Sequence, residues 1–202
     1  MSIRSRMKPW IQDLAMRQMD PLRSETIEEA RGDVLEIGFG TALNLRYYDS
    51  KVTSLVGLDP MDVANVEKVQ RRIQSAAFPI ERKALRADGG LPFDQARFDT
   101  VITTWTLCSI PEVGKALREM RRVLKPGGKY LFIEHGRADS DSTAKWQDRI
   151  NPLWKHVCDG CNINRKIDRL VEEGGFEMES LNRFRAKGPG IVAQMYRGIA
   201  TR

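Results

Sequence analysis

The stretch that decides the fold is Val34-Leu35-Glu36-Ile37-Gly38-Phe39-Gly40-Thr41-Ala42-Leu43-Asn44. An apolar run ends on an acidic residue and then passes through two glycines into residues that favour a helix. The glycines allow a sharp turn and let a ligand approach the backbone more closely than a Cβ atom would permit. The pattern predicts that a nucleotide-like cofactor lies over the end of a strand, against the N-terminus of the following helix.

The spacing after the second glycine separates two classes of cofactor. A dinucleotide fingerprint has a third glycine three residues after the second, but Leu43 stands at that position. An NAD-dependent oxidoreductase is therefore the less favoured alternative. The pattern E-x-G-x-G-x-A, which starts at Glu36, instead resembles the first motif of the class I S-adenosylmethionine-dependent methyltransferases, in which the last position is often glycine.

Two further acidic residues follow apolar runs that we predict to be strands. Asp59 comes directly after the run 53–58, and Asp88 stands in the segment 86–93. An ionised carboxylate can accept hydrogen bonds from both ribose hydroxyls of a nucleoside, which suits Asp59, or from an adenine N6 amine, which suits Asp88. The alternative for Asp59 is a loop residue that caps the helix expected from residue 62.

The order of predicted elements indicates an α/β fold. Strands and helices alternate from Gly32 to Glu134, which is typical of a Rossmann-like, mostly parallel sheet with helices on both faces. Two final strands complete a seven-stranded sheet. We expect strands at 33–37, 53–58, 80–85, 98–104, 128–134, 176–184 and 191–199. We expect helices at 42–48, 62–76 and 112–124, the last one stopped by Lys125-Pro126-Gly127-Gly128.

The length of 202 residues favours one domain over 1–202. Within it we predict an N-terminal helical lid at 1–31, a cofactor-binding core at 32–135, and a final part at 136–202 whose insertion covers 136–165. The lid is expected from apolar residues at helical spacing, which are Ile3, Met7, Trp10, Ile11 and Leu14. The alternative is a basic amphipathic helix in peripheral contact with an anionic membrane, suggested by Arg4, Arg6, Lys8 and Arg17.

Four motifs occur in order, namely the glycine turn, Asp59, the Asp88 segment and the run 117–128. Together they resemble, over residues 32–135, the small-molecule class I methyltransferases often called type 11. The resemblance implies binding of S-adenosyl-L-methionine, which leaves as S-adenosyl-L-homocysteine. It assigns the cofactor site to Glu36, Gly38, Gly40, Asp59, Pro60, Asp88, Gly89, Thr104 and Trp105.

The C-terminal part narrows the resemblance. The run Trp154-Lys155-His156-Val157-Cys158-Asp159-Gly160-Cys161 is similar to the W-K-H-x-x-D-G-C run of the methyltransferase-like 7 proteins, whose animal members are thiol S-methyltransferases. The resemblance implies a small-molecule methyl acceptor, with a thiol as a candidate. Those animal proteins begin with a hydrophobic anchor, which this sequence does not show, and have a glycine where Ala42 stands.

Methyl transfer from a sulfonium is an in-line displacement with a neutral leaving group, so alignment matters more than acid–base chemistry. A thiol acceptor with an ordinary pKa of about 8.5 needs only modest help to ionise. The candidate catalytic residues are His135, at the end of a predicted strand, and the pair His156 and Asp159. The alternatives are structural, with His135 holding the insertion down and His156 and Asp159 organising it.

The cysteines give an incomplete metal pattern. Three is an odd number and no export signal is recognised, so we expect thiols and not structural disulfides. Cys158 and Cys161 form a single C-x-x-C pair, whereas structural zinc takes four ligands. Cys108 or His135 would complete a site only if the fold brings them together, and we expect Cys108 in the core. We therefore assign no metal; thiol-rich sites also bind trivalent arsenic.

Charge and composition limit the partners. The formal net charge of +6 is moderate, and we interpret the pairs Arg71-Arg72 and Arg121-Arg122 as solvated helix faces. Basic residues are not interleaved with aromatic ones, and the segment 104–110 lacks the Asn/Asp-Pro-Pro-aromatic run typical of nucleic-acid amine methyltransferases. We therefore do not expect nucleic acid as a partner. No run of about 18 apolar residues occurs, which predicts a cytoplasmic protein.

Two alternatives to a small-molecule methyltransferase stay open. The basic N-terminal segment also suits an enzyme that methylates phospholipids or quinone-type lipids. The cofactor motif alone also suits a regulatory protein that binds the cofactor without turnover. The sequence specifies neither the acceptor nor the oligomeric state.

Overall fold

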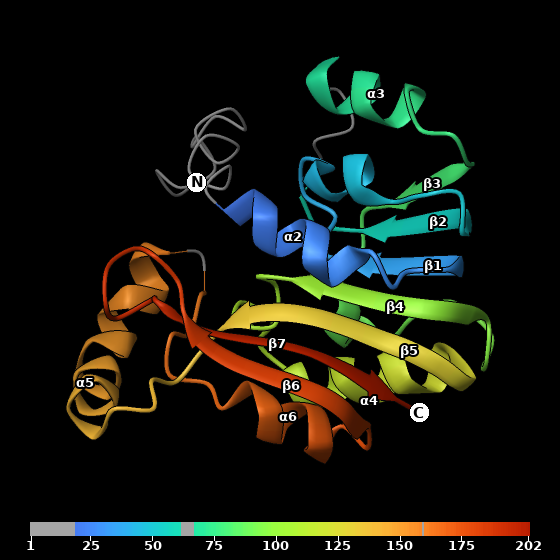
Figure 1. Cartoon of the computed structure of the whole chain (residues 1–202). Coiled ribbons are helices and arrows are strands. Elements are labelled where there is room, and N and C mark those ends of the chain that lie inside the picture. Colours follow the sequence, from blue (N-terminus) through green and yellow to red (C-terminus); the bar gives the residue numbers. More distant parts are fainter. Residues whose placement is uncertain (1–18, 62–66, 159) are drawn as a thin grey trace.

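The computed structural model describes residues 19–61, 67–158 and 160–202. Figure 1 shows one central sheet with helices on both faces, and its seven strands run in the order β3-β2-β1-β4-β5-β7-β6. The strands are β1 (Gly32–Ile37), β2 (Val52–Leu58), β3 (Ile80–Lys83), β4 (Phe98–Thr104), β5 (Leu124–His135), β6 (Glu177–Arg185) and β7 (Gln194–Thr201). The helices are α2 (Asp20–Ile27), η3 (Leu43–Tyr47), α3 (Glu67–Gln74), η4 (Ala87–Gly89), α4 (Val113–Val123), α5 (Asp141–Val157) and α6 (Ile167–Glu173).

The strand directions confirm the predicted Rossmann-like, mostly parallel sheet. β1 pairs in parallel with β2 and β4, β2 with β3, and β4 with β5. β7 lies between β5 and β6 and is antiparallel to both. The carboxyl ends of the parallel strands therefore meet at one edge. The chain reverses its winding between β1 and β4, and ligands of open α/β sheets bind outside such a switch point.

Alternate residues of β1 face two separate cores. Leu35 and Ile37 pack in the core beneath α4 and α6, whereas Val34 packs in the core beneath α2 and η3. Because side chains alternate along a strand, Glu36 points to the same face as Val34. Helices thus cover both faces, as predicted, and Glu36 is directed towards the α2 side.

Several element bounds differ from the prediction. The segment expected as a helix over 42–48 is a short 3₁₀ helix, which follows Ala42 in the left-handed conformation at φ 63°. β5 begins at Leu124, directly after α4, so that Pro126 lies within its bounds. Proline cannot donate a ladder hydrogen bond, and the register with β4 shifts between Phe98 and Thr100. Of the helix expected over 62–76, residues 62–66 lie outside the described part.

The insertion after β5 consists mainly of the 17-residue helix α5, which lies beyond the carboxyl end of β5 in Figure 1. Gln147 of α5 donates to the carbonyls of Gly136 and Ile191, which attaches this helix to the sheet edge. The apolar stripe predicted for the lid lies outside the described residues, so the lid stays a prediction. No helix within the described ranges is long and apolar enough to cross a membrane.

Candidate functional site

The two glycines of the turn after β1 have different reasons to be glycine. Gly38 has φ 82°, and a Cβ there would overlap the side chain of Thr106 from the β4 loop. Gly40 has φ 49°, and a Cβ there would meet only Asp59 Oδ2 and the Gly38 carbonyl oxygen, each at 3.9 Å. The space over Gly40 is therefore open to a ligand, while the space over Gly38 is filled by the protein.

Asp59 lies at the carboxyl end of β2 and faces this turn. It is buried, its Oδ2 accepts from the Gly40 amide at 2.8 Å, and its Oδ1 accepts from the Met61 amide at 2.8 Å. Each carboxylate oxygen can accept a second hydrogen bond. The carboxylate is therefore held in a fixed orientation and still has acceptor capacity for two ribose hydroxyls. Pro60, the next residue, is exposed.

Asp88 lies in η4, the next segment along the same sheet edge. Arg86 donates to it from Nε to Oδ1 at 3.1 Å and from Nη2 to Oδ2 at 2.9 Å, and the Glu112 amide donates to Oδ2 at 3.3 Å. The hydrogen bonds from Arg86 hold the pKa of Asp88 below its usual range. The group is thus an ionised acceptor, as an adenine amine requires. Gly89, the next residue, is exposed, and a Cβ atom at that position would have no neighbour within 4 Å.

Helix α4 fixes the loop that follows Asp88. The Leu91 amide donates to Glu119 Oε2 at 2.9 Å, and Arg122 donates to the carbonyls of Phe93 and Leu91, each at 2.9 Å. The same arginine pairs with Glu119, and these hydrogen bonds lower the pKa of that carboxyl to about 2. The interpretation of Arg122 as part of a solvated face is therefore wrong, because its guanidinium links α4 to the loop.

Glu36, near the end of β1, is almost fully buried, at 1 % exposure. It accepts hydrogen bonds from Asn44 Nδ2 at 2.9 Å and from the Tyr48 hydroxyl at 2.6 Å. Burial raises its pKa to about 7, against the lowering effects of Tyr48 and of the nearby Arg23. A cation placed beside Glu36 would favour its ionised form.

Arg23 from α2 reaches into the same place, and the sequence interpretation missed it. Its Nη1 donates to Asn44 Oδ1 at 2.6 Å and to Thr104 Oγ1 at 3.4 Å, and its guanidinium lies 4.7 Å from the centre of the Trp105 ring. Arg23 is buried, and its Nε has no hydrogen-bond partner within the described residues. The sequence could have identified Arg23 by its spacing, because it comes four residues before the core residue Ile27 and so lies on the same helix face.

Thr104 ends β4 beside this network, and Trp105 follows it. The Trp105 amide donates to the Ile133 carbonyl at 2.8 Å, and the Thr104 carbonyl accepts from the Thr106 hydroxyl at 3.1 Å. Trp105 adopts φ 50°, a left-handed conformation that only a tightly held turn gives to a bulky residue. A carbonyl oxygen has two lone pairs, so the Thr104 carbonyl can still accept from a ligand ammonium.

His135 lies at the carboxyl end of β5, next to Trp105's strand, and meets two cysteines. Its Nε2 is 3.2 Å from Cys161 Sγ, to which Trp154 Nε1 also donates at 3.4 Å. Cys108 is buried, as expected, and its Sγ belongs to the same cluster. The Cys108 thiol, followed by His135 and Trp154, lowers the pKa of Cys161, while burial opposes that change. The fold therefore does bring Cys108 and His135 to Cys161.

The second predicted catalytic pair is not joined to this cluster. His156 is exposed in the last turn of α5, and its side chain makes no hydrogen bond or ion pair within the described ranges. It comes two residues after Trp154, so it lies on a different side of the helix. Asp159 lies outside the described residues. A catalytic role for His156 and Asp159 stays a prediction.

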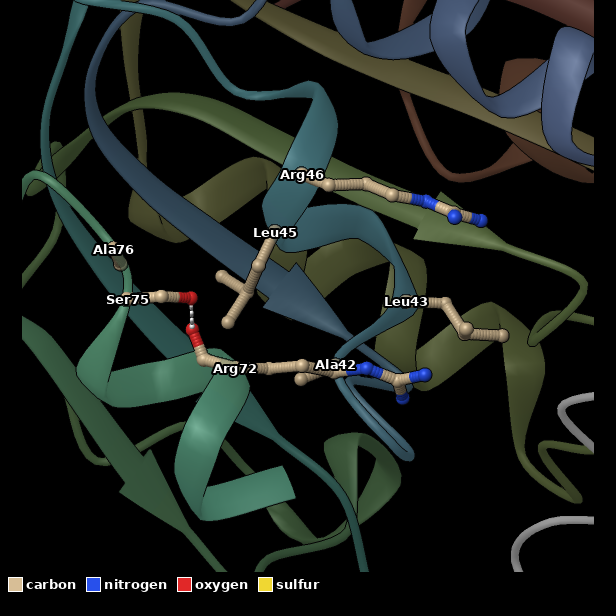
Figure 2. A pocket seen from close by; sticks show the side chains of 7 residues that line it. All are labelled: Ala42, Leu43, Leu45, Arg46, Arg72, Ser75 and Ala76. Atoms are coloured by element: carbon tan, nitrogen blue, oxygen red, sulfur yellow. Dashed lines mark hydrogen bonds between the residues drawn. The ribbon is translucent and has the colours of Figure 1, made fainter. Parts of the chain in front are cut away.

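A cavity of about 170 Å³ lies between η3 and α3, and Figure 2 shows the side chains that line it. It is smaller than the roughly 300 Å³ or more typical of small-molecule sites, and it does not include Asp59 or Asp88. Arg72 crosses it to donate to the Thr41 carbonyl at 2.6 Å, so this arginine also supports the turn and is not merely solvated. The lining residues are Ala42, Leu43, Leu45, Arg46, Arg72, Ser75 and Ala76.

Comparisons with known proteins agree with this geometry. Residues 35–132 match the family described as "Methyltransferase domain". Thiol S-methyltransferase TMT1B of Rattus norvegicus is 35% identical over 156 residues, which are 71% of this chain and 59% of the rat protein. The Homo sapiens TMT1B is 32% identical over 188 residues, 83% of this chain and 72% of the human protein.

Among solved structures, the [4+2]-cyclase SpnF superposes with a TM-score of 0.71 at 19% identity, over 95% of this chain and 82% of the cyclase. At that identity the likeness shows the fold alone. The chain spans about three fifths of the length of the rat relative.

Proposed function

The chain belongs to the class I S-adenosylmethionine-dependent methyltransferases, and we propose that it transfers the methyl group of S-adenosyl-L-methionine to a small thiol. One observation carries the proposal, the row of oriented acceptor groups at the carboxyl edge of the sheet. Glu36, Asp59 and Asp88 end or follow β1, β2 and β3 in that order. Relatives named thiol S-methyltransferases, at 32% and 35% identity, support the thiol.

The described residues fit the cofactor at both of its ends. Asp59 has acceptor capacity for the ribose, and Asp88 is an ionised acceptor for the adenine amine. The open space over Gly40 leaves room for the nucleoside, since no side chain fills it. The fit thus rests on lone pairs and space that the protein itself leaves unused.

We assign the methionine end to the network around Glu36. The buried Nε of Arg23 makes no hydrogen bond within the described residues, since Asp20 Oδ1 is 4.0 Å away, and a ligand carboxylate would satisfy it. Glu36 and the Thr104 carbonyl suit the ammonium group. Gly38, Pro60, Gly89 and Trp105 shape the surrounding backbone in this assignment.

When bound, S-adenosyl-L-methionine supplies a methyl group on a positively charged sulfur. The contribution of the chain is to hold that group in line with the acceptor, and correct orientation alone can lower the barrier by roughly 7–11 kcal/mol. His135, the predicted acid–base residue at the end of β5, has its Nε2 facing Cys161 Sγ. Its Nδ1 has no partner within the described residues, so this nitrogen could take the proton of an acceptor.

The test is a methyl-transfer assay with labelled S-adenosyl-L-methionine against small thiols, phenols, amines, phospholipid vesicles and quinones. We expect label on thiols, with Asp59→Asn losing transfer and the exposed Asp49→Asn retaining it. Label only on vesicle lipids or quinones would overturn the thiol and favour the lipid alternative. Tight cofactor binding without any labelled acceptor would favour the regulatory alternative.

A further inference from the structure

Three side chains that can ligate a metal meet at the acceptor side of the sheet edge. Cys108 comes from the loop after β4, His135 from the end of β5, and Cys161 from the segment after α5. One ligand atom of each, the two Sγ atoms and a ring nitrogen, all lie within 4.8 Å of one another. Cys108 and Cys161 are 53 positions apart in the chain, so they do not meet through a local motif.

The protein builds this cluster with further hydrogen bonds. Asn162 donates to the Cys108 carbonyl from its amide at 2.8 Å and from its Nδ2 at 3.0 Å. Asn151 of α5 in turn donates to Asn162 Oδ1 at 3.2 Å. The backbone on either side of the two thiols is therefore fixed, because one asparagine connects the segments that carry them.

His135 joins the end of β5 to the insertion through one ring nitrogen. The residue is 9% exposed, its Nε2 faces only a sulfur, and its buried Nδ1 has no partner within the described residues. Nε2 is therefore the ring nitrogen placed to bind a metal together with the Cys161 sulfur. Nδ1 would need a partner of its own when a metal is bound, as the second ring nitrogen of a metal-binding histidine usually does.

We propose that Cys108, His135 and Cys161 bind one zinc ion and leave its fourth position for an exogenous thiolate. Thiolate and imidazole are the ligands that zinc prefers, and zinc sites with three protein ligands keep one open position. In a tetrahedral site with ordinary bond lengths the ligand atoms are about 3.5–3.8 Å apart. The observed cluster needs shifts of no more than about 1 Å to reach that geometry.

The surrounding charges are compatible with such an ion. Two thiolates and one Zn²⁺ form a neutral unit, which costs less to bury than separate charges. The Arg165 guanidinium donates to the Leu107 carbonyl and lies close enough to interact electrostatically with Cys108, Cys161 and the buried Glu134. Its positive charge would offset the negative charge that an exogenous thiolate adds.

The open position gives the ion a use in the proposed reaction, and this last step rests on the proposed thiol acceptor. Cys108 Sγ is 3.8 Å from the Trp105 carbonyl oxygen, so the cluster adjoins the edge assigned to the cofactor. A metal cation lowers the pKa of a thiol that it binds. The thiol proton leaves to solvent, the acceptor sulfur forms the new S–C bond, and the C–S bond of the sulfonium breaks with its electron pair on the departing thioether.

Cobalt(II) is the probe, because its spectrum reports thiolate ligation and tetrahedral geometry without any methyl transfer. Reduced, metal-free protein is titrated with Co²⁺, and zinc content is measured in the protein as purified. We expect about one metal per chain, with sulfur-to-cobalt charge-transfer bands. Cys161→Ser and Cys108→Ser should weaken binding by at least about 10-fold, whereas the matched control Cys158→Ser, outside the cluster, should retain it.

Adding 2-mercaptoethanol to the cobalt protein tests the fourth position, which should show an additional charge-transfer band. Absence of stoichiometric binding by folded wild-type protein, equal loss in Cys158→Ser, or a Cys108–Cys161 disulfide in the purified protein would each overturn the site. Full methylation of thiols by the metal-free protein would overturn the proposed activation of the acceptor thiol by the metal. Cobalt binding that depends on the cluster, without transfer to any thiol, would leave the metal site standing while the proposed acceptor fails.

Discussion

The two halves of the sheet edge are built in different ways. On the side of β1, β2 and η4, short local motifs place the acidic residues, and backbone amides orient them, as at Asp59. On the side of β4 and β5, side chains from distant segments meet, as Cys161 and His135 do across the insertion. In the first half, which we assign to the cofactor, the partners of each carboxylate lie close to it in the chain, as Asn44 and Tyr48 do for Glu36 and Arg86 does for Asp88. The second is a side-chain site whose chemistry can differ between relatives.

The largest effect is expected where the glycine turn touches the other half. In Gly38→Ala the new Cβ overlaps Thr106 at a backbone conformation that alanine disfavours, so the free energy of unfolding should fall by about 3 kcal/mol or more. The matched control is Gly89→Ala, whose Cβ meets nothing within 4 Å. Urea unfolding of both variants measures the difference. Equal stabilities would show that Thr106 does not pack against the turn.

Asp59→Asn tests whether the cofactor half depends on charged acceptors. The amide side chain replaces one acceptor oxygen with a donor, and hydrogen bonds to charged groups are worth about 1.5–3 kcal/mol. We expect the dissociation constant for S-adenosyl-L-methionine to rise roughly 10- to 100-fold. Calorimetry against Asp49→Asn, an exposed residue whose oxygens bind Lys51, provides the comparison. An unchanged constant would remove Asp59 from the cofactor site.

The pH dependence of cofactor affinity distinguishes Glu36 from Asp59. Burial raises the pKa of Glu36 to about 7, so without a ligand the carboxyl is protonated below pH 7. A bound ammonium favours the ionised form, and binding then releases a proton. The affinity should fall as the pH drops below 7, by up to about tenfold per unit. Calorimetry in buffers of different ionisation enthalpy measures the released proton. A pH-independent affinity in wild type, equal to that of Glu36→Gln, would place the ammonium elsewhere.

The same contrast explains what the sequence could predict. The mostly parallel sheet and the places of Glu36, Asp59 and Asp88 follow from local periodicity and from glycines, because these features depend on neighbours in the chain. Arg23 and the Cys108–His135–Cys161 cluster depend on packing between segments far apart, which periodicity does not encode. Arg122 was misjudged for the same reason, since its partners lie in a loop about 30 positions away.

The smallest effect is expected at Ala42, which has φ 63°. The resemblance to the methyltransferase-like 7 proteins implies glycine at this position. A left-handed alanine costs about 1–2 kcal/mol. Glycine would remove that cost. It would also lower the free energy of unfolding by about 0.5–1 kcal/mol, because a glycine chain is freer when unfolded, and by about 0.8 kcal/mol, because the buried methyl group is lost. These contributions nearly cancel, so Ala42→Gly should leave the free energy of unfolding almost unchanged.

Ala96 provides the comparison that isolates the methyl group. It has φ 56°, nearly the same backbone conformation, but is only half-buried, whereas Ala42 is 1% exposed. Ala96→Gly should therefore stabilise the fold by about 0.5 kcal/mol, measured by urea unfolding beside Ala42→Gly. If Ala42→Gly gave the larger gain, its methyl group would contribute nothing to the core under α2. The alanine at the cofactor turn would then be strain without compensation, and the turn would owe its shape to the two glycines alone.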